Sequence, residues 1–133
     1  MKKLILTIFF YITLLSMVLC QKTTYTGGEI YIFVQKDGVI LTEIPQGRDA
    51  EVNYDEFYKK YTIYYTDSDN KFHVFPLKFI QQKSIYMRMV DDFDHLYDVH
   101  DLLKEKKKLI IFNLKIEENG TMAGFVIRNL KKS

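Results

Sequence analysis

The chain has 133 residues, a length typical of one domain, and its formal net charge at pH 7 is only +2. Lys2 and Lys3 lie in a segment that we expect to be removed, so the remaining chain is neutral and does not suggest a nucleic-acid-binding protein. Cys20 is the single cysteine, which excludes an internal disulfide framework.

Residues 1–20 have the pattern of an export signal. Lys2 and Lys3 form a short positive region, residues 4–19 are an uncharged apolar run, and polar residues follow at once. A permanent membrane helix needs about 20 apolar residues. We therefore expect a cleaved signal peptide over 1–20 and a single β-rich domain over 21–133. The mature protein would lie in the periplasm, in the cell envelope or outside the cell.

Processing at Cys20 and Gln21 has two interpretations. In the first, signal peptidase cuts after Cys20 and leaves Gln21 as the new N-terminus, which resembles bacterial signals that end in a small residue before Gln. In the second, Cys20 is the lipidated first residue of a lipoprotein. Leu19 stands where such a signal normally has Gly, Ala or Ser, so the first is favoured. Lipidation at Cys20 would be the only membrane attachment of the mature chain.

β-Branched and aromatic runs separated by turn-forming residues predict a series of strands. Residues 29–35 and 39–44 flank Asp37-Gly38, a pair that favours a type I′ hairpin turn. Residues 45–47 predict the end of this hairpin, and residues 48–56 are expected to be irregular.

A second hairpin is expected over residues 57–66 and 71–80, joined by a four-residue loop. That loop length would place His73 opposite Tyr64. Pro76 cannot donate to a β-ladder, so it predicts an edge or a bulge. Residues 84–90 predict a further strand.

The last hairpin is predicted from Asn119-Gly120, which separates residues 108–117 from 121–130. A two-residue loop pairs Glu118 with Thr121. If the register continues unchanged, one face is apolar throughout, and it pairs Ile116 with Ala123, Leu114 with Phe125 and Phe112 with Ile127.

Residues 91–108 have two interpretations. They form one helix, or residues 91–94 form a turn into a short strand over 95–100 and the helix begins only at Asp101. The alternation of residues 96–100 favours the shorter helix. We expect a mainly antiparallel β fold of about seven strands with one short helix near residues 101–107, either a sandwich or a half-open barrel.

Aromatic residues give the candidate ligand site. His73 beside Phe75, with Tyr58 and Tyr64 on the preceding strand, could line an aromatic pocket, although cross-strand packing is the more common explanation of such residues. His95 and His100 lie among several aspartates, but a spacing of five does not bring them together on a helix or a strand. No metal, cofactor or catalytic residue is therefore assigned.

Three functional hypotheses follow. The first is a non-enzymatic binding module whose partner is a protein, a glycan or a small apolar ligand. The second is a small hydrolase or isomerase that uses His73 or the region of His95 and His100 as an acid–base group. The third is an immunity or inhibitor protein directed against an envelope toxin or enzyme. No nucleic acid is expected as a partner.

Overall fold

The computed structural model describes residues 2–19 and 22–133, and of these the side chains of 15–19 and 115–118 are left undescribed. The elements, in chain order, are α1 (Lys2–Leu19), β1 (Lys22–Lys36), β2 (Val39–Asp55), β3 (Lys60–Asp67), β4 (Phe72–Gln82), β5 (Met87–Val90), β6 (Leu96–Leu102), α2 (Leu103–Lys106), β7 (Lys108–Glu118), β8 (Thr121–Arg128) and β9 (Lys131–Lys132). Among the residues that the structure describes, no helix has the length and hydropathy of a membrane span.

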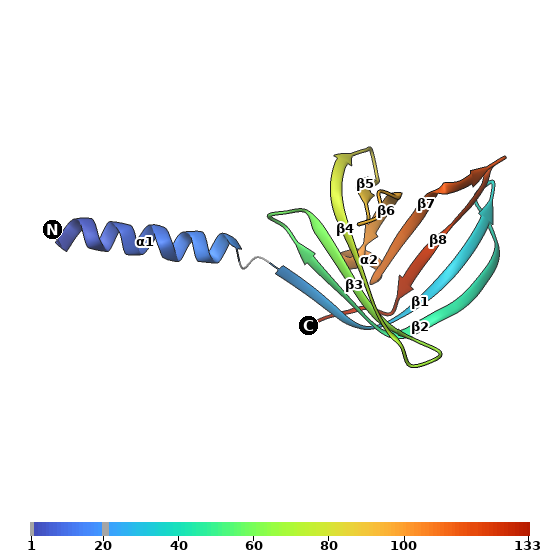
Figure 1. Ribbon diagram of the computed structural model, residues 1–133, viewed down its shortest axis with the longest axis horizontal. Coiled ribbons are helices and arrows are strands. Elements are labelled where there is room, and N and C mark those ends of the chain that lie inside the picture. The colour runs from blue at the N-terminus through green and yellow to red at the C-terminus, as the bar shows by residue number, and fades with distance from the viewer. Residues whose placement is uncertain (1, 20–21) are drawn as a thin grey trace.

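Strands β1 to β8 form a closed antiparallel barrel (Figure 1). Each strand pairs with the next along the chain, β8 pairs with β1, and β9 adds two residues to β1 at Tyr25 and Thr26. The expected antiparallel β fold is confirmed, and the barrel is the architecture observed. Residues 48–55 were expected to be irregular, but they continue β2 in pairs with both β1 and β3.

The first hairpin turns as predicted but does not end where predicted. Asp37 and Gly38 both have positive φ, at 51° and 83°, which is the geometry of a type I′ turn. The predicted end at residues 45–47 is wrong. Gly47 still pairs with Ile30, and β-bulges along β1 and β2 absorb the irregular sequence without breaking the ladder.

The turns between successive strands define an open end and a closed end of the barrel. The β1–β2, β3–β4, β5–β6 and β7–β8 turns lie at one end, because successive antiparallel strands reverse direction. We call this the open end, since Val39, Leu41, Phe72 and Phe93 at its rim are more than half exposed. At the opposite end, the closed end, the side chains of Leu103 from α2 and Leu130 are buried.

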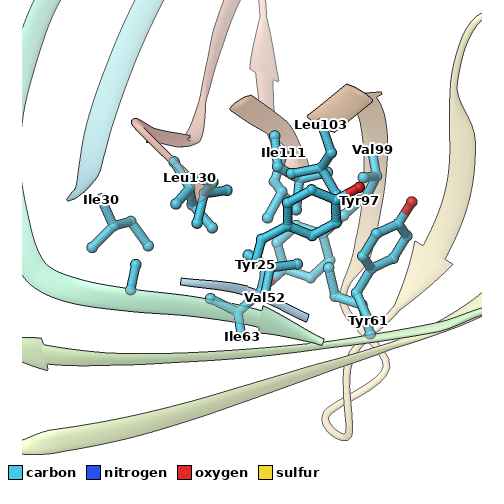
Figure 2. Packing of buried hydrophobic residues seen from close by; sticks show 14 of the residues in the cluster. Tyr25, Ile30, Val52, Tyr61, Ile63, Tyr97, Val99, Leu103, Ile111 and Leu130 are labelled. Carbon is cyan, nitrogen blue, oxygen red and sulfur yellow. The ribbon is translucent and has the colours of Figure 1, made fainter. Parts of the chain in front are cut away.

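The barrel interior is the main hydrophobic core (Figure 2). Its buried side chains alternate along the strands with outward-facing ones, as the two-residue period of a strand requires. Every strand from β1 to β8 contributes at least one of these buried residues, which include Tyr25, Ile30, Val52, Tyr61, Ile63, Leu77, Met89, Tyr97, Val99, Ile111 and Ile127. No residue of α1 is among the described members of this core.

A second, smaller cluster lies on the outside of the barrel over β1, β7 and β8. Its buried members are Phe33, Phe112 and Val126. The rings of Phe33 and Phe112 meet edge to face with centroids 5.5 Å apart. Both residues pair with Gly124 of β8 from opposite sides, so the two rings cover the bare glycine.

The predicted register of the last hairpin is wrong beyond its turn. Glu118 pairs with Thr121 as expected, but Phe112 pairs with Gly124, Ile111 with Phe125 and Leu109 with Ile127. The register therefore shifts by three residues between Asn113 and Glu118. Because three is odd, the inward face of β7 is reversed: Leu109 and Ile111 point into the barrel and Phe112 points out.

The segment after β5 follows the shorter of the two predicted helices. Residues 91–95 form a turn, β6 covers Leu96–Leu102, and α2 covers only Leu103–Lys106. The α2 helix ends at Lys107, whose φ of 54° is left-handed, and the chain then turns directly into β7. Pro76 also behaves as predicted. In the described ladder, β5 pairs only with residues 78–82 of β4, so β4 is an edge beside Pro76.

Candidate functional site

A cavity of about 190 Å³ lies inside the open half of the barrel. Its walls come from β1, β3, β4 and β8, strands that are distant in sequence but adjacent in the closed barrel. The residues that line it are Ile30, Tyr65, His73, Val74, Phe75 and Phe125. It lies beside the stretch of β4 that has no β5 partner in the described ladder.

The floor of the cavity is aromatic. Phe75 meets Tyr97 edge to face, with ring centroids 5.3 Å apart, and lies 6.0 Å from the ring of Phe125. Tyr97 is itself buried in the core. Offset and edge-to-face ring contacts hold aromatic side chains in defined orientations, so this floor separates the cavity from the packed interior below it.

One side of the cavity carries polar groups. The Nε2 atom of His73 lies 2.7 Å from Oδ2 of Asp67, and the His73 ring stacks on Tyr65 with centroids 4.8 Å apart. Asp67 also accepts hydrogen bonds from the backbone N–H groups of Asp69 and Lys71. The hydrogen bond from His73 and those from the backbone hold the pKa of Asp67 below its usual range. Asp67, at the start of the β3–β4 turn, therefore places a negative charge at the lip of the cavity.

The Tyr65 hydroxyl adds a second polar group. Burial raises the pKa of Tyr65, and a hydrogen bond with Gln46 acts in the opposite direction. The hydroxyl therefore stays protonated at neutral pH and can donate or accept one hydrogen bond. Together with His73, it gives an otherwise apolar cavity one polar side.

The structure brings together only two of the four predicted ligand residues. His73 and Phe75 line the cavity. Tyr58 and Tyr64 lie instead along a separate depression of about 230 Å³ that also involves Lys22, Asn53, Asp55, Lys60 and Thr62. Tyr64 stacks on Phe72, with centroids 5.9 Å apart and rings 20° from parallel.

The cause is a loop that has three residues where four were predicted. His73 pairs with Tyr65, not with Tyr64, and Phe75 pairs with Ile63. Asn70 adopts a left-handed φ of 62°, and the backbone N–H of Asp67 donates to the carbonyl oxygen of Lys71. A turn followed by a left-handed residue is the usual three-residue hairpin loop. This one-residue slip exchanges the two faces of β3 relative to β4.

Sequence reasoning missed Tyr65, Ile30 and Phe125. The signal for Tyr65 was present in residues 67–70, which set the loop length. An Asp side chain accepts hydrogen bonds from the turn backbone, and Asn tolerates the positive φ that this three-residue loop needs. Ile30 and Phe125 come from β1 and β8, and their place beside His73 depends on closure of the barrel. No local pattern encodes that closure.

A second cavity, of about 220 Å³, lies at the closed end. It is lined by Thr23, Tyr25, Tyr54, Glu56, Asp101, Leu103, Lys104 and Glu105. The Tyr61 hydroxyl donates a short hydrogen bond to Asp101, which also accepts from the backbone N–H of Leu103. These bonds fasten the start of α2 to the barrel interior, so the polar groups here already have a structural role.

The other two histidines lie apart. His95 Nδ1 is 3.1 Å from Oδ2 of Asp91 in the β5–β6 turn. His100 lies on β6 with its ring edge to face with Tyr86, centroids 5.3 Å apart. Within residues 2–19 and 22–133, no three His, Cys, Asp or Glu side chains are grouped as metal ligands.

The processing residues Cys20 and Gln21 lie outside the described residues. Comparison of the chain with protein-family models, with curated proteins and with solved structures finds no match.

Proposed function

We propose that this protein is a non-enzymatic binding protein that holds a small apolar group in the cavity at the open end of the barrel. The observation that carries the proposal is the cavity itself: three aromatic rings and an isoleucine surround a space with one polar side. Small ligand sites have this composition, with a few placed polar groups that orient the ligand.

The cavity size limits the ligand. An apolar cavity of about 150 Å³ is large enough to hold benzene, and this one measures about 190 Å³. The enclosed part of the ligand is therefore a single ring or a short branched alkyl group. A larger molecule would have to leave its remainder outside the barrel.

The polar side limits the ligand further. His73 is bonded to the anionic Asp67 and stacks on the ring of Tyr65 at the lip of the cavity. A ligand with a hydroxyl or amine next to its apolar group would satisfy these groups when it displaces water. A fully polar sugar would leave the aromatic floor unused. Among the partners considered from sequence, the small apolar ligand is therefore favoured over the glycan.

The expected export signal gives the setting. If residues 1–20 direct export, the ligand would be met in the cell envelope or outside the cell. The neutral charge of the remaining chain fits an uncharged or singly charged ligand better than a polyanion in this cavity.

The test is a titration of residues 22–133 with phenol, benzyl alcohol, benzylamine and cyclohexanol, with glucose as the polar control. Binding would change tyrosine fluorescence, and it would raise the melting temperature because a ligand that binds only the folded state stabilises it. A lack of response to all four ring compounds would contradict the proposal.

Adjacent tyrosines of β3 provide a matched pair of variants. Tyr65→Ala removes a cavity wall, and we expect it to weaken binding about tenfold, because an aromatic contact contributes roughly 1 kcal/mol beyond its buried area. Tyr64→Ala removes the same side chain from outside the cavity and should leave the affinity within about twofold. Equal losses in both variants would place the ligand elsewhere.

The His73–Asp67 pair favours one second candidate, acid–base chemistry at the same cavity. A carboxylate that orients an imidazole is the arrangement used by many general bases. This candidate requires turnover of a bound compound that disappears in His73→Ala while the fold persists. Binding without turnover in the titration above would exclude it for the compounds tested.

A further inference from the structure

The charges of the barrel are segregated between its two ends. The net charge of the chain beyond Lys3 is zero, yet the basic residues gather at the closed end and the acidic turns at the open end. Figure 1 shows the start of β1, the β2–β3 turn and the C-terminus on the same side of the barrel. The net charge is therefore zero although positive and negative side chains are unevenly distributed between the two ends of the barrel.

Ten lysines lie at the closed end. The β2–β3, β4–β5 and β6–β7 connections each carry at least one of them, and lysines are also the first residue of β1 and both residues of β9. They are Lys22, Lys59, Lys60, Lys83, Lys104, Lys106, Lys107, Lys108, Lys131 and Lys132. Seven of these are exposed, and Lys60, Lys83 and Lys108 are half-buried. The positive charge thus surrounds the end of the barrel.

Few acidic residues oppose these lysines. The same end contains Asp55, Glu56, Asp101 and Glu105, and Asp101 is already bonded to Tyr61 inside the barrel. Among the described residues, none of the ten lysines forms an ion pair within 4.0 Å. The Nζ atom of Lys59 lies over the ring of Phe79, 4.6 Å from its centroid.

The open end has the opposite charge. Its turns contain six aspartates, against three nearby bases, which are Lys36, Lys71 and Arg48, whose guanidinium donates to the side chain of Asn70 in the β3–β4 turn. These aspartates are Asp37, Asp67, Asp69, Asp91, Asp92 and Asp94. A negatively charged surface would therefore attract the closed end and repel the open end.

We propose that the closed end docks on an anionic lipid bilayer. Lysines distributed around the end of a barrel can meet a plane together, whereas a nucleic-acid strand would need them along a groove. The chain also enters the barrel at this end, since β1 begins at Lys22. Any tether at Cys20 would hold the closed end, and not the open end, next to the bilayer.

Docking in this orientation leaves the cavity of the open end accessible. The acidic turns and the cavity lie at the end opposite the lysines. The bilayer would then set the direction in which the barrel faces, independently of which ligand it binds. The proposal stands whether or not the cavity binds a small molecule.

The test is co-sedimentation of residues 22–133, which contain the whole barrel and both hydrophobic clusters, with lipid vesicles. We expect binding to phosphatidylcholine vesicles that contain phosphatidylglycerol, and none to phosphatidylcholine alone. Binding should weaken as salt is raised, because the attraction is screened. No binding to the anionic vesicles, or equal binding to both, overturns the proposal.

Two double variants of equal charge decide where the contact lies. Lys104→Gln with Lys106→Gln removes two exposed charges of the closed end. This double variant should bind about 30-fold more weakly, because each lysine near an anionic surface strengthens binding roughly fivefold. Lys36→Gln with Lys71→Gln removes two exposed charges of the open end and should change binding less than about twofold.

Two further outcomes count against the docking model. Equal weakening by both double variants would show that overall charge, not the closed end, controls binding. Soluble heparin that binds more tightly than the anionic vesicles and displaces the protein from them would identify a polyanion chain as the partner instead. Circular dichroism of each variant checks that the barrel is intact.

Discussion

Tyr61 illustrates how one side chain fixes the closed end. Its ring is fully buried and lies 4.6 Å from the ring of Tyr54, and its hydroxyl donates to the carboxylate of Asp101. Burial, followed by the negative charge of Asp101, raises the pKa of Tyr61 far above its usual value. The hydroxyl therefore remains a donor at neutral pH.

Removing this donor should destabilise the protein. We expect Tyr61→Phe to lower the free energy of unfolding by about 2 kcal/mol, because hydrogen bonds to charged groups contribute more than neutral ones. Urea unfolding measures this change. In a double-mutant cycle with Asp101→Asn, the double variant should lose less stability than the sum of the losses in the two single variants. Fully additive losses would mean that the bond does not contribute to stability.

Asp91 links the β5–β6 turn to the core. Burial acts to raise its pKa, but the hydrogen bonds from the backbone N–H groups of His95 and Phe93 and from the Tyr97 hydroxyl outweigh it. The pKa of Asp91 is therefore below its usual value. Burial and the bond to Asp91 also raise the pKa of Tyr97 to about 12, so Tyr97 stays a donor.

This depressed pKa predicts a pH dependence. A carboxyl group with a lower pKa in the folded state stabilises the protein above its unfolded pKa, and that stabilisation is lost as pH falls through the folded pKa. Asp91→Asn should therefore be less stable than the wild type at neutral pH, and the difference should shrink as pH falls from neutral through the folded-state pKa of Asp91. Urea midpoints across this range test it. A constant difference would contradict the role of ionisation.

At the scale of elements, Gly124 sets how closely β7 and β8 approach. A Cβ atom there would overlap the carbonyl oxygen of Ile111 and lie 3.0 Å from Cα of Phe112. The rings of Phe33 and Phe112 meet outside this glycine. The absence of a side chain thus allows both the strand contact and the aromatic cover.

Gly124→Ala should separate the two strands. We expect a loss of about 3 kcal/mol in the free energy of unfolding, because the overlap is with backbone that cannot rotate away. Gly38→Asn is the control, since its site has open space and a positive φ that Asn tolerates. If thermal melts show equal effects in the two variants, the close approach at Gly124 is not what stabilises the hairpin.

The hairpins show what local sequence can predict and where it stops. Asp37-Gly38 predicted the turn type, because turn geometry depends on the turn residues themselves. The register of β7 against β8 was predicted at Glu118 and lost by Asn113. The shift lets Leu109 and Ile111 face the core, a preference that depends on β1 and β6 and so lies outside the hairpin.

The candidate site was half predicted for the same reason. His73 and Phe75 alternate on one strand, so their shared face follows from sequence alone. Tyr65 required the correct loop length, and Phe125 required β8 to pair with β1. Residues that share a strand were identified, and residues brought together by long-range pairing were not.

At the scale of the whole molecule, barrel closure decides between the two predicted architectures. The pairing of β1 with β2 continues from Lys36–Val39 to Lys22–Asp55, and four register shifts bend it. Bulged strands curve and twist more strongly than regular ones, which allows the sheet to meet itself. Sequence patterns predict which residues alternate along a strand, but they do not predict how many bulges it contains. They therefore do not distinguish a sandwich from a barrel.

The closed barrel predicts that residues 22–133 fold without α1. Both hydrophobic clusters consist of residues between Tyr25 and Leu130, and none of their described members comes from α1. Because Cys20 is the only cysteine, a reductant should leave the melting temperature unchanged. We expect one cooperative transition when circular dichroism follows the thermal unfolding of residues 22–133. A broad, non-cooperative melt, or one that sharpens only when α1 is present, would show that α1 completes the fold.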